Sequence, residues 1–168
     1  MLANIEIVVI SFIASVAFGV VFQIRKEDLI WAGLGGMLTR IVYLILMAFI
    51  PFRIVYAGAA AFFAAAYADF IAIKRKTPAT LFLYPSIVPL IPGDLIYYTF
   101  GGVVVGNDQM FYSYGQELLL ALIGICVGFV LSSTVILYVR KARIKKFFAK
   151  AADTVAAMAG VELDKVEK

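Results

Sequence analysis

The sequence predicts an all-α integral membrane protein with five transmembrane helices, and three observations support this fold class. The composition is 64% hydrophobic, with a mean hydropathy of +0.98, whereas soluble domains are roughly 45–50% apolar. Five apolar stretches are each long enough to cross a bilayer, which requires about 20 residues. No polar segment is long enough to bury a core of its own. We therefore expect one membrane domain, 1–139, followed by a tail, 140–168.

The first apolar stretch, Ala3–Phe22, has no basic segment before it and no small-x-small cleavage site after it. We interpret it as a retained helix and not as a signal peptide. The other expected spans are Leu29–Ile50, Ile54–Ile73, Thr80–Val105 and Leu118–Val139.

The placement of the basic residues predicts that the N-terminus is outside and the C-terminus is in the cytoplasm. Five spans put the first loop, the third loop and the tail on one side, and that side holds 13 of the 15 Lys and Arg residues. Cytoplasmic segments carry such an excess. A four-span alternative with a re-entrant fourth segment would separate the Lys74–Lys76 cluster from the basic tail, against this rule. Because the net charge of +4 follows the topology, no nucleic-acid partner is expected.

Three prolines interrupt the fourth span, at Pro85, Pro89 and Pro92, and Gly93 follows them. A proline inside a helix removes one backbone hydrogen bond and clashes with the preceding turn. Neighbouring helices can absorb one such kink in a membrane, but three prolines predict a broken helix. Transporter substrate sites are commonly built from broken helices. The candidate binding residues here are Pro85, Ser86, Pro89, Pro92, Gly93 and Tyr97.

Arg40 lies close to the middle of the second expected span. An arginine at this depth costs at least about 2.5–3.5 kcal/mol on insertion scales and usually faces a cavity or a partner. Its guanidinium could bind a substrate carboxylate through paired hydrogen bonds. Alternatively, it could form a purely structural ion pair with Asp69 or Asp94.

Asp69 and Asp94 are the candidate proton-coupling residues. Asp94 follows Pro92-Gly93 near the middle of the fourth span, and Asp69 lies about one turn before the Lys74–Lys76 cluster. A carboxylate that carries protons needs a pKa raised by burial. The alternatives are that Asp69 pairs with a cation at the interface and that Asp94 lies in an aqueous vestibule.

Enzymatic chemistry finds little support in the sequence, and we expect a non-enzyme. The chain has no histidine, and its single cysteine, Cys126, lies in an apolar run. Zinc and haem sites, histidine-dependent triads and an internal disulfide are therefore not expected, and no metal or cofactor is predicted. A remote alternative is an intramembrane aspartyl protease with Asp69 and Asp94 as a dyad that shares a proton. The glycine expected three residues before the second aspartate is replaced by Ile91.

The tail, 140–168, places apolar residues at helical spacing opposite lysines. These residues are Ile144, Phe147, Phe148, Ala151, Val155 and Met158. The pattern predicts an amphipathic cytoplasmic helix that lies on the anionic surface of the bilayer, or one that docks on a partner subunit.

Small residues in the spans predict close contacts between helices. They include Gly33, Gly35 and Gly36 before Arg40, an alanine-rich stretch around Gly58, and the pairs Gly102/Gly106 and Gly124/Gly128.

The run from Lys76 to Gly93 reads Lys-Thr-Pro-Ala-Thr-x-Phe-Leu-x-Pro-x-Ile-x-Pro-Leu-x-Pro-Gly, and Tyr97-Tyr98-Thr99 follows it. Together with the glycine-rich second span up to Arg40, this run resembles the threonine/serine exporter family. It is most similar to the small five-span subunit of that family, which is related to the small component of the bacterial succinate exporter. The resemblance covers about Ala14 to Val105.

The resemblance implies proton-driven export of small carboxylates, either threonine and serine or a dicarboxylate such as succinate. It also implies a multi-pass protein of the prokaryotic cytoplasmic membrane that works with a larger membrane subunit; a homo-oligomer is a further option. By position, Pro85, Pro89, Pro92 and Gly93 match the family signature, and Arg40 matches its second-span arginine. Ser86 and Asp94 stand where the family pattern has small residues. The alternative function is a structural or regulatory subunit whose partner carries the substrate site.

Overall fold

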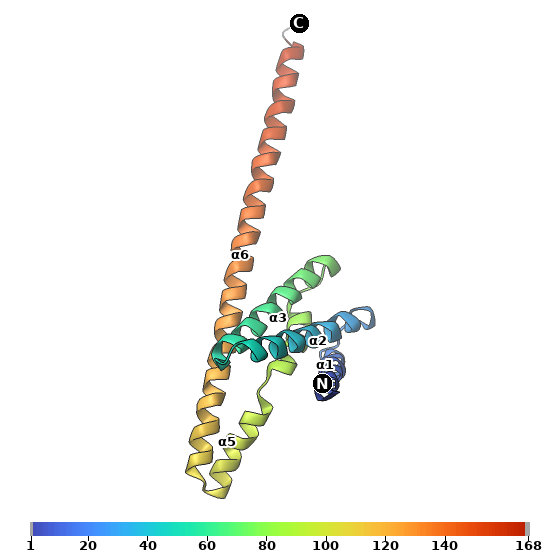
Figure 1. Cartoon of the computed structure of the whole chain (residues 1–168). Helices are drawn as coiled ribbons and strands as arrows, with labels where there is room; N and C mark the ends of the chain where they lie inside the picture. The colour runs from blue at the N-terminus through green and yellow to red at the C-terminus, as the bar shows by residue number, and fades with distance from the viewer. Residues whose placement is uncertain (1, 167–168) are drawn as a thin grey trace. The chain divides into compact units, whose positions relative to one another are not determined.

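The structure is a computed structural model that describes residues 2–166, with the side chains of 5–142, 144 and 145. All regular structure in the described residues is helical, which confirms the all-α part of the predicted fold class (Figure 1). In chain order the elements are α1 (Leu2–Val21), α2 (Lys26–Phe49), α3 (Arg53–Arg75), α4 (Thr80–Ile87), the 3-10 turn η1 (Val88–Leu90), α5 (Gly93–Val105) and α6 (Asp108–Val166). The chain divides after Ser133 into two compact units, so α6 contributes to both.

Three helical segments of the described residues are long and apolar enough to cross a membrane: α2, α3 and Asp108–Ala142 of α6. The pair formed by Thr80–Leu90 and Gly93–Val105 counts as a fourth if it is one span, and it is bent by 54°. The described part of α1, Ile5–Val21, is a shorter apolar helix. The interruption of the fourth segment is therefore a feature of the structure, whereas the total of five spans and the orientation stay predictions.

The connection between α5 and α6 is shorter than the sequence suggested. Gly106 ends α5 with a φ of 70°, a left-handed conformation that suits glycine. The side chain of Asn107 then accepts a hydrogen bond of 3.0 Å from the backbone N–H of Met110, as a helix N-cap does. Consequently α6 begins at Asp108, and most of the polar stretch 106–117 is helical. The polar residues of this stretch indicate exposure to water, and they are compatible with a helix.

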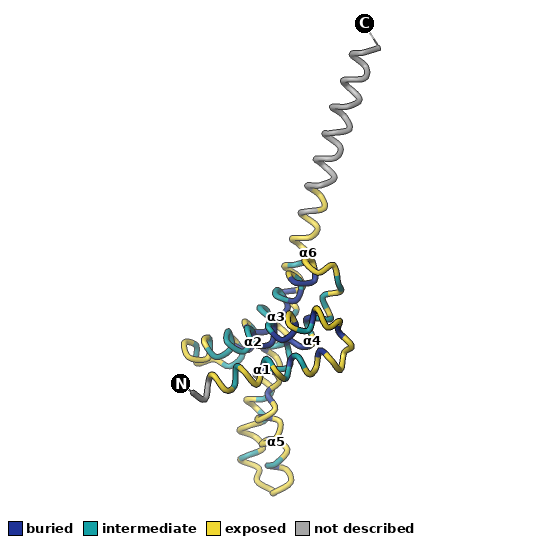
Figure 2. Tube along the Cα trace, turned by 90° about the vertical axis from the view of Figure 1, so that its right-hand side faces the viewer, coloured by how far each residue is buried: buried dark blue, intermediate teal, exposed yellow. Residues whose placement is uncertain are grey.

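The buried residues gather where α2, α3 and α4 meet, whereas α5 is largely exposed (Figure 2). One cluster contains Ile24, Ala32, Ala68, Ile71, Ala72 and Phe82, and a second contains Ala60, Ala61 and Leu90. Alanines dominate the buried face of α3, which allows the neighbouring helices to approach closely. In a membrane such helices are held mainly by van der Waals contact.

Glycines of α2 make room for the proline-containing helix α4. A Cβ on Gly35 would clash with the hydroxyl of Ser86, and a Cβ on Gly36 would lie 2.7 Å from the Cβ of Ser15 and 3.3 Å from the carbonyl of Pro85. The packing predicted for these two glycines is therefore confirmed.

A second close approach joins α3 and α6 within the first unit. A Cβ on Gly58 would lie 2.8 Å from the carbonyl of Gly124, and one on Gly128 would overlap the carbonyl of Gly58. Gly102 packs in the same way, 2.7 Å from the backbone nitrogen of Phe111. Gly106, by contrast, serves the turn and meets nothing within 4 Å.

The second unit, from Thr134 onward, is the helical continuation of α6 as far as Val166. Ile144 of the predicted apolar face is exposed. The remaining residues of that face, from Phe147 to Met158, lie outside the described side chains. Contact of this face with the membrane surface or with a partner stays a prediction.

Candidate functional site

The broken helix leaves carbonyl groups that other parts of the chain satisfy. In a regular helix the carbonyl of Pro85 would accept a hydrogen bond from the backbone N–H of residue 89, but Pro89 has none. The hydroxyl of Ser15 on α1 donates to this carbonyl instead, at 2.9 Å. Likewise, the carbonyl of Val88 has no N–H to bond at residue 92, because that residue is proline. It accepts a hydrogen bond from the N–H of Ile91 instead, at 3.3 Å.

Arg40 on α2 contacts the next carbonyl along the break. Its Nη1 donates to the carbonyl of Pro89 at 3.2 Å, and its guanidinium carbon lies 5.1 Å from the centre of the Tyr43 ring. The Nε of Arg40 is buried without a hydrogen-bond partner. The structure thus gives the guanidinium a backbone carbonyl and an aromatic face, and leaves donor capacity for a further acceptor.

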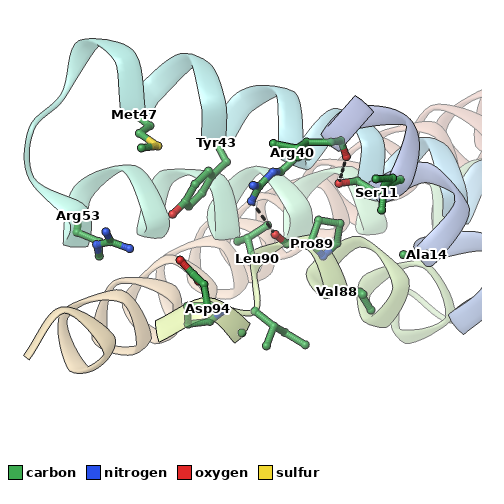
Figure 3. Close-up of a pocket in the computed structure, with 15 residues that line it drawn as sticks. Ser11, Ala14, Arg40, Tyr43, Met47, Arg53, Val88, Pro89, Leu90 and Asp94 are labelled. Atoms are coloured by element: carbon green, nitrogen blue, oxygen red, sulfur yellow. Dashed lines mark hydrogen bonds between the residues drawn. The ribbon is translucent and has the colours of Figure 1, made fainter. Parts of the chain in front are cut away.

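These groups line a cavity of about 550 Å³ (Figure 3), within the roughly 300–1,000 Å³ of small-molecule pockets. Its walls come from the middle of α1, the C-terminal half of α2, the start of α3, the break itself and the first turn of α5. The lining residues are Ile7, Ile10, Ser11, Ala14, Arg40, Tyr43, Met47, Arg53 and every residue from Val88 to Asp94.

The cavity contains two cations and one carboxylate. Arg53, at the start of α3, is already paired, because its Nε lies 2.5 Å from a carboxylate oxygen of Glu117 on α6. Asp94, in the first turn of α5, directs its carboxylate toward the helix that carries Arg40 and Tyr43 (Figure 3). Among the described residues, no ion pair joins Arg40 or Asp94 to an opposite charge. Two opposite charges on separate walls are therefore available to a solute.

The cavity brings together Arg40 and four of the predicted residues on the fourth segment: Pro89, Pro92, Gly93 and Asp94. The other predicted residues lie elsewhere. Pro85 and Ser86 are fully buried and do not line the cavity, and the Ser86 hydroxyl donates to the carbonyl of Phe82 at 2.7 Å. Tyr97 is 74% exposed on α5, and Asp69 on α3 is not among the lining residues.

The sequence reasoning missed Ser15, Tyr43 and Arg53. Tyr43 had a detectable signal, since it follows Arg40 by three residues and therefore shares its helix face. Arg53 lies in the short connection between the expected spans Leu29–Ile50 and Ile54–Ile73, and this position does not point to a cavity. Nothing local in the sequence distinguishes Ser15 from the other hydroxyls of the apolar helices.

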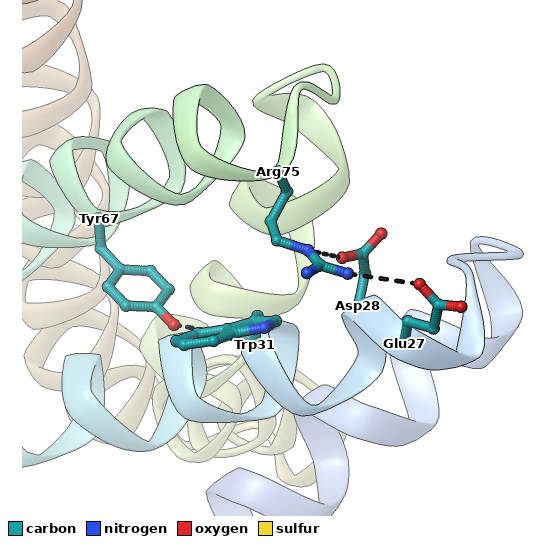
Figure 4. A network of polar contacts seen from close by, with 5 residues as sticks. All are labelled: Glu27, Asp28, Trp31, Tyr67 and Arg75. Atoms are coloured by element: carbon teal, nitrogen blue, oxygen red, sulfur yellow. Dashed lines mark hydrogen bonds and ion pairs between the residues drawn. The ribbon is translucent and has the colours of Figure 1, made fainter.

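At the other end of α2 and α3, a polar network holds the two helices together (Figure 4). Nε of Arg75 donates to a carboxylate oxygen of Asp28 at 2.6 Å, and Nη2 lies 3.6 Å from a carboxylate oxygen of Glu27. The hydroxyl of Tyr67 donates to the backbone carbonyl of Trp31 at 2.8 Å. This end of the helix pair is therefore closed by direct contacts.

The aspartyl-protease hypothesis requires two carboxylates in one cavity. Asp94 lines the cavity and Asp69 does not, so the geometry does not support a dyad.

Comparison with known families identifies the class of protein. The model of the family described as "Threonine/Serine exporter, ThrE" matches residues 7–135, well over half of the chain. The chain belongs to the threonine/serine exporter family. This confirms the resemblance seen in the sequence, and it makes the chain a member of a family of membrane transporters and not of enzymes. No curated protein and no solved structure gives a significant match.

The matched region contains every residue of the exporter that lines the cavity, from Ile7 to Asp94, together with Glu117. It ends at residue 135, close to the boundary between the two compact units. The part of the chain that carries the family relationship is thus the helical unit with the broken helix, and the helical continuation after it lies outside the match.

Proposed function

We propose that this exporter-family chain carries a site for small zwitterionic amino acids, such as threonine and serine, in the cavity beside the broken helix. Arg40 binds the substrate carboxylate, and Asp94 binds its ammonium group. The observation that carries this proposal is the presence of one available cation and one available carboxylate on separate walls of the cavity. An α-amino acid has the same two charges.

The pairing of the second arginine favours an amino acid over a dicarboxylate. A dicarboxylate such as succinate would need two cations, but Arg53 lies against Glu117. The Asp94 carboxylate would also repel a second negative group.

The proposal includes proton coupling. Asp94 is the better placed of the two candidate carboxylates, because it lines the cavity and Asp69 does not. Protonation of Asp94 would release the ammonium group, so one carboxylate could link substrate release to proton binding. Asp69 remains the alternative carrier on α3.

Two ion pairs support the proposed five-span topology. Arg53 at the start of α3 pairs with Glu117 in the N-terminal part of α6, at the level that the charge pattern places outside. Asp28 at the start of α2 pairs with Arg75 at the end of α3, at the level that it places in the cytoplasm. In addition, α3 and α6 run parallel in the first unit, since Ile54 and Gly58 meet Gly124 and Gly128 in the same order. A re-entrant fourth segment would start α6 at the Arg75 end. The pairing with Arg53 instead favours a broken span that crosses the membrane.

As the family relationship implies, we place the exporter in the prokaryotic cell membrane. With the proposed topology, its cavity lies toward the outer side of that membrane. The cytoplasmic end, where Arg75 holds Asp28, is closed. The structure then corresponds to a state from which substrate leaves the cell. The large apolar side chains exposed on α5, such as Phe100 and Val104, suit contact with lipid or with a larger partner subunit of the same family.

Transport in proteoliposomes tests the proposal. The chain is reconstituted alone and together with its partner subunit, and the movement of labelled threonine, serine and succinate is measured. We expect threonine and serine to be carried in preference to succinate, and we expect Arg40→Ala to abolish transport while the protein still inserts. Undiminished transport by Arg40→Ala would remove the proposed role. Transport by the partner alone would assign the site to that subunit.

A further inference from the structure

We propose that Ser15 is a positioning residue of the transport site. Its hydroxyl replaces the backbone N–H that Pro89 lacks, and it thereby holds α4 and η1 in the orientation that presents Pro89–Asp94 to the cavity. The role of Ser15 in transport rests on the proposed function. Its role in holding the broken helix rests on the contacts alone.

The first step is the missing donor. The carbonyl of Pro85 faces a position four residues later that has no N–H, because residue 89 is proline. A buried carbonyl without a partner is unfavourable, and in hydrocarbon it must be satisfied within the protein. Ser15 is fully buried, and its Oγ lies 2.9 Å from this carbonyl. The two residues are 70 positions apart in the chain.

The second step is the space that this contact requires. Gly36 of α2 lies against both partners, since a Cβ at this position would come 2.7 Å from the Cβ of Ser15 and 3.3 Å from the Pro85 carbonyl. Three helices therefore meet at one hydrogen bond: α1 supplies the donor, α4 supplies the acceptor, and α2 supplies the gap. Arg40 follows one turn after Gly36 on α2 and contacts the carbonyl of Pro89.

The third step is the consequence for the cavity. The residues after Pro85 form η1 and the break, and they line the cavity from Val88 to Asp94. The hydrogen bonds of Ser15 and Arg40 attach this segment to α1 and α2 at successive prolines. Ser15 itself is not among the lining residues, so it acts on the substrate through the broken helix and not by contact.

A cycle of substitutions in the full chain tests the proposal. Ser15→Ala removes the donor, and Pro89→Ala supplies an N–H that can bond the Pro85 carbonyl in a continuous helix. Ser132→Ala is the matched control, because Ser132 is also fully buried and its Oγ has no hydrogen-bond partner. Thermal unfolding of the purified protein and threonine transport with the partner subunit are the two measurements.

We expect Ser15→Ala to lower Tm by about 4–8 °C, as loss of a partner for a buried acceptor would in a chain of this size. Ser132→Ala should not lower Tm, because it removes a buried hydroxyl that has no partner. Pro89→Ala should restore Tm in the Ser15→Ala background. In the transport assay, the half-saturating threonine concentration should rise about tenfold for Ser15→Ala. The double variant Ser15→Ala/Pro89→Ala should not regain the wild-type concentration, because Pro89→Ala straightens the broken helix.

An unchanged Tm in Ser15→Ala would overturn the proposal. A lowered Tm that Pro89→Ala does not restore would also overturn it, because the link to the missing N–H would then be wrong. If Tm follows the expected cycle but threonine binding in Ser15→Ala equals wild type, the positioning role is refuted. If the wild type transports no amino acid, the proposed function fails. The Tm values of the variants still show whether Ser15 stabilises the broken helix through the Pro85 carbonyl.

Discussion

Asp28, in the first turn of α2, forms an ion pair of 2.6 Å with Arg75 in the last turn of α3. The side chain of Asp28 is only 3% exposed, while that of Arg75 is 35% exposed. Each charge also lies at the favourable end of its own helix dipole. This pair holds together the ends of α2 and α3 that lie away from the cavity, and a transporter that loads from that side would have to separate them.

Arg75→Gln should destabilise the protein by about 3 kcal/mol, because it leaves the Asp28 carboxylate buried without its partner. Thermal or denaturant unfolding in detergent measures the effect. Glu27→Gln is the matched control. Its carboxylate is 84% exposed and 3.6 Å from Arg75, so its loss should cost less than about 1 kcal/mol. Equal effects of the two variants would contradict the assignment of the closure to Asp28.

Asp94→Asn should weaken the binding of amino acids selectively. A hydrogen bond to a charged group contributes about 1.5–3 kcal/mol, so the half-saturating concentration of threonine should rise at least about tenfold. A hydroxycarboxylate of similar size without an ammonium group should bind no more weakly than before. Competition against labelled threonine measures both. A uniform loss for the two solutes would show that Asp94 does not recognise the ammonium group.

Glu117→Gln should change which anions bind. The substitution leaves Arg53 without its ion pair of 2.5 Å, so the cavity gains a second available cation. Succinate should then compete with threonine several-fold better than it does against the wild-type protein. The measurement is the ratio of the inhibition constants of succinate in the two proteins. A ratio of one would mean that Arg53 is not accessible to a solute in the cavity.

Gly36→Ala should destabilise the protein by about 1–3 kcal/mol, as overpacking does, because the new methyl group would overlap Ser15 and approach the Pro85 carbonyl. Gly115→Ala on α6 is the control. Its nearest neighbour would be a side-chain carbon of Thr99 at 3.6 Å, and alanine favours the helix over glycine by about 1 kcal/mol. Comparison of the two Tm values tests the prediction, which fails if Gly36→Ala is as stable as wild type.

Several features of the site could be predicted from local sequence. Pro85, Pro89 and Pro92 lack the N–H groups that a helix needs, so a break between Thr80 and Val105 follows from proline chemistry in any context. Arg40 in an apolar stretch likewise required a polar partner. These are properties of single residues and of their spacing.

Other features of the site depended on contacts between distant parts of the chain. Ser15 and Pro85 are 70 residues apart, and Arg40 and Pro89 are 49 apart. Arg53 directly precedes the expected span Ile54–Ile73 and Glu117 directly precedes the expected span Leu118–Val139, and neither position reveals that they pair. The start of α6 at Asp108 was missed for a different reason: polarity reports exposure to water, whereas the helix there depends on the cap made by Asn107.

Composition and the proline run predicted an all-helical membrane protein with an interrupted helix, and the run from Lys76 to Gly93 gave a resemblance to the threonine/serine exporter family that the family match confirmed. Hydropathy, charge bias and missing backbone donors are additive, local quantities, so they can be read along the chain. The three-dimensional arrangement is needed to show which groups satisfy the freed carbonyls and which charges face the cavity. These contacts depend on how closely the helices approach at Gly36 and Gly58. They also join residues far apart in the chain, which no local sequence pattern connects. Tertiary packing thus brings Ser15 and Arg40 to the carbonyls of the broken helix and pairs Arg53 with Glu117, while Arg40 and Asp94 form no ion pair among the described residues.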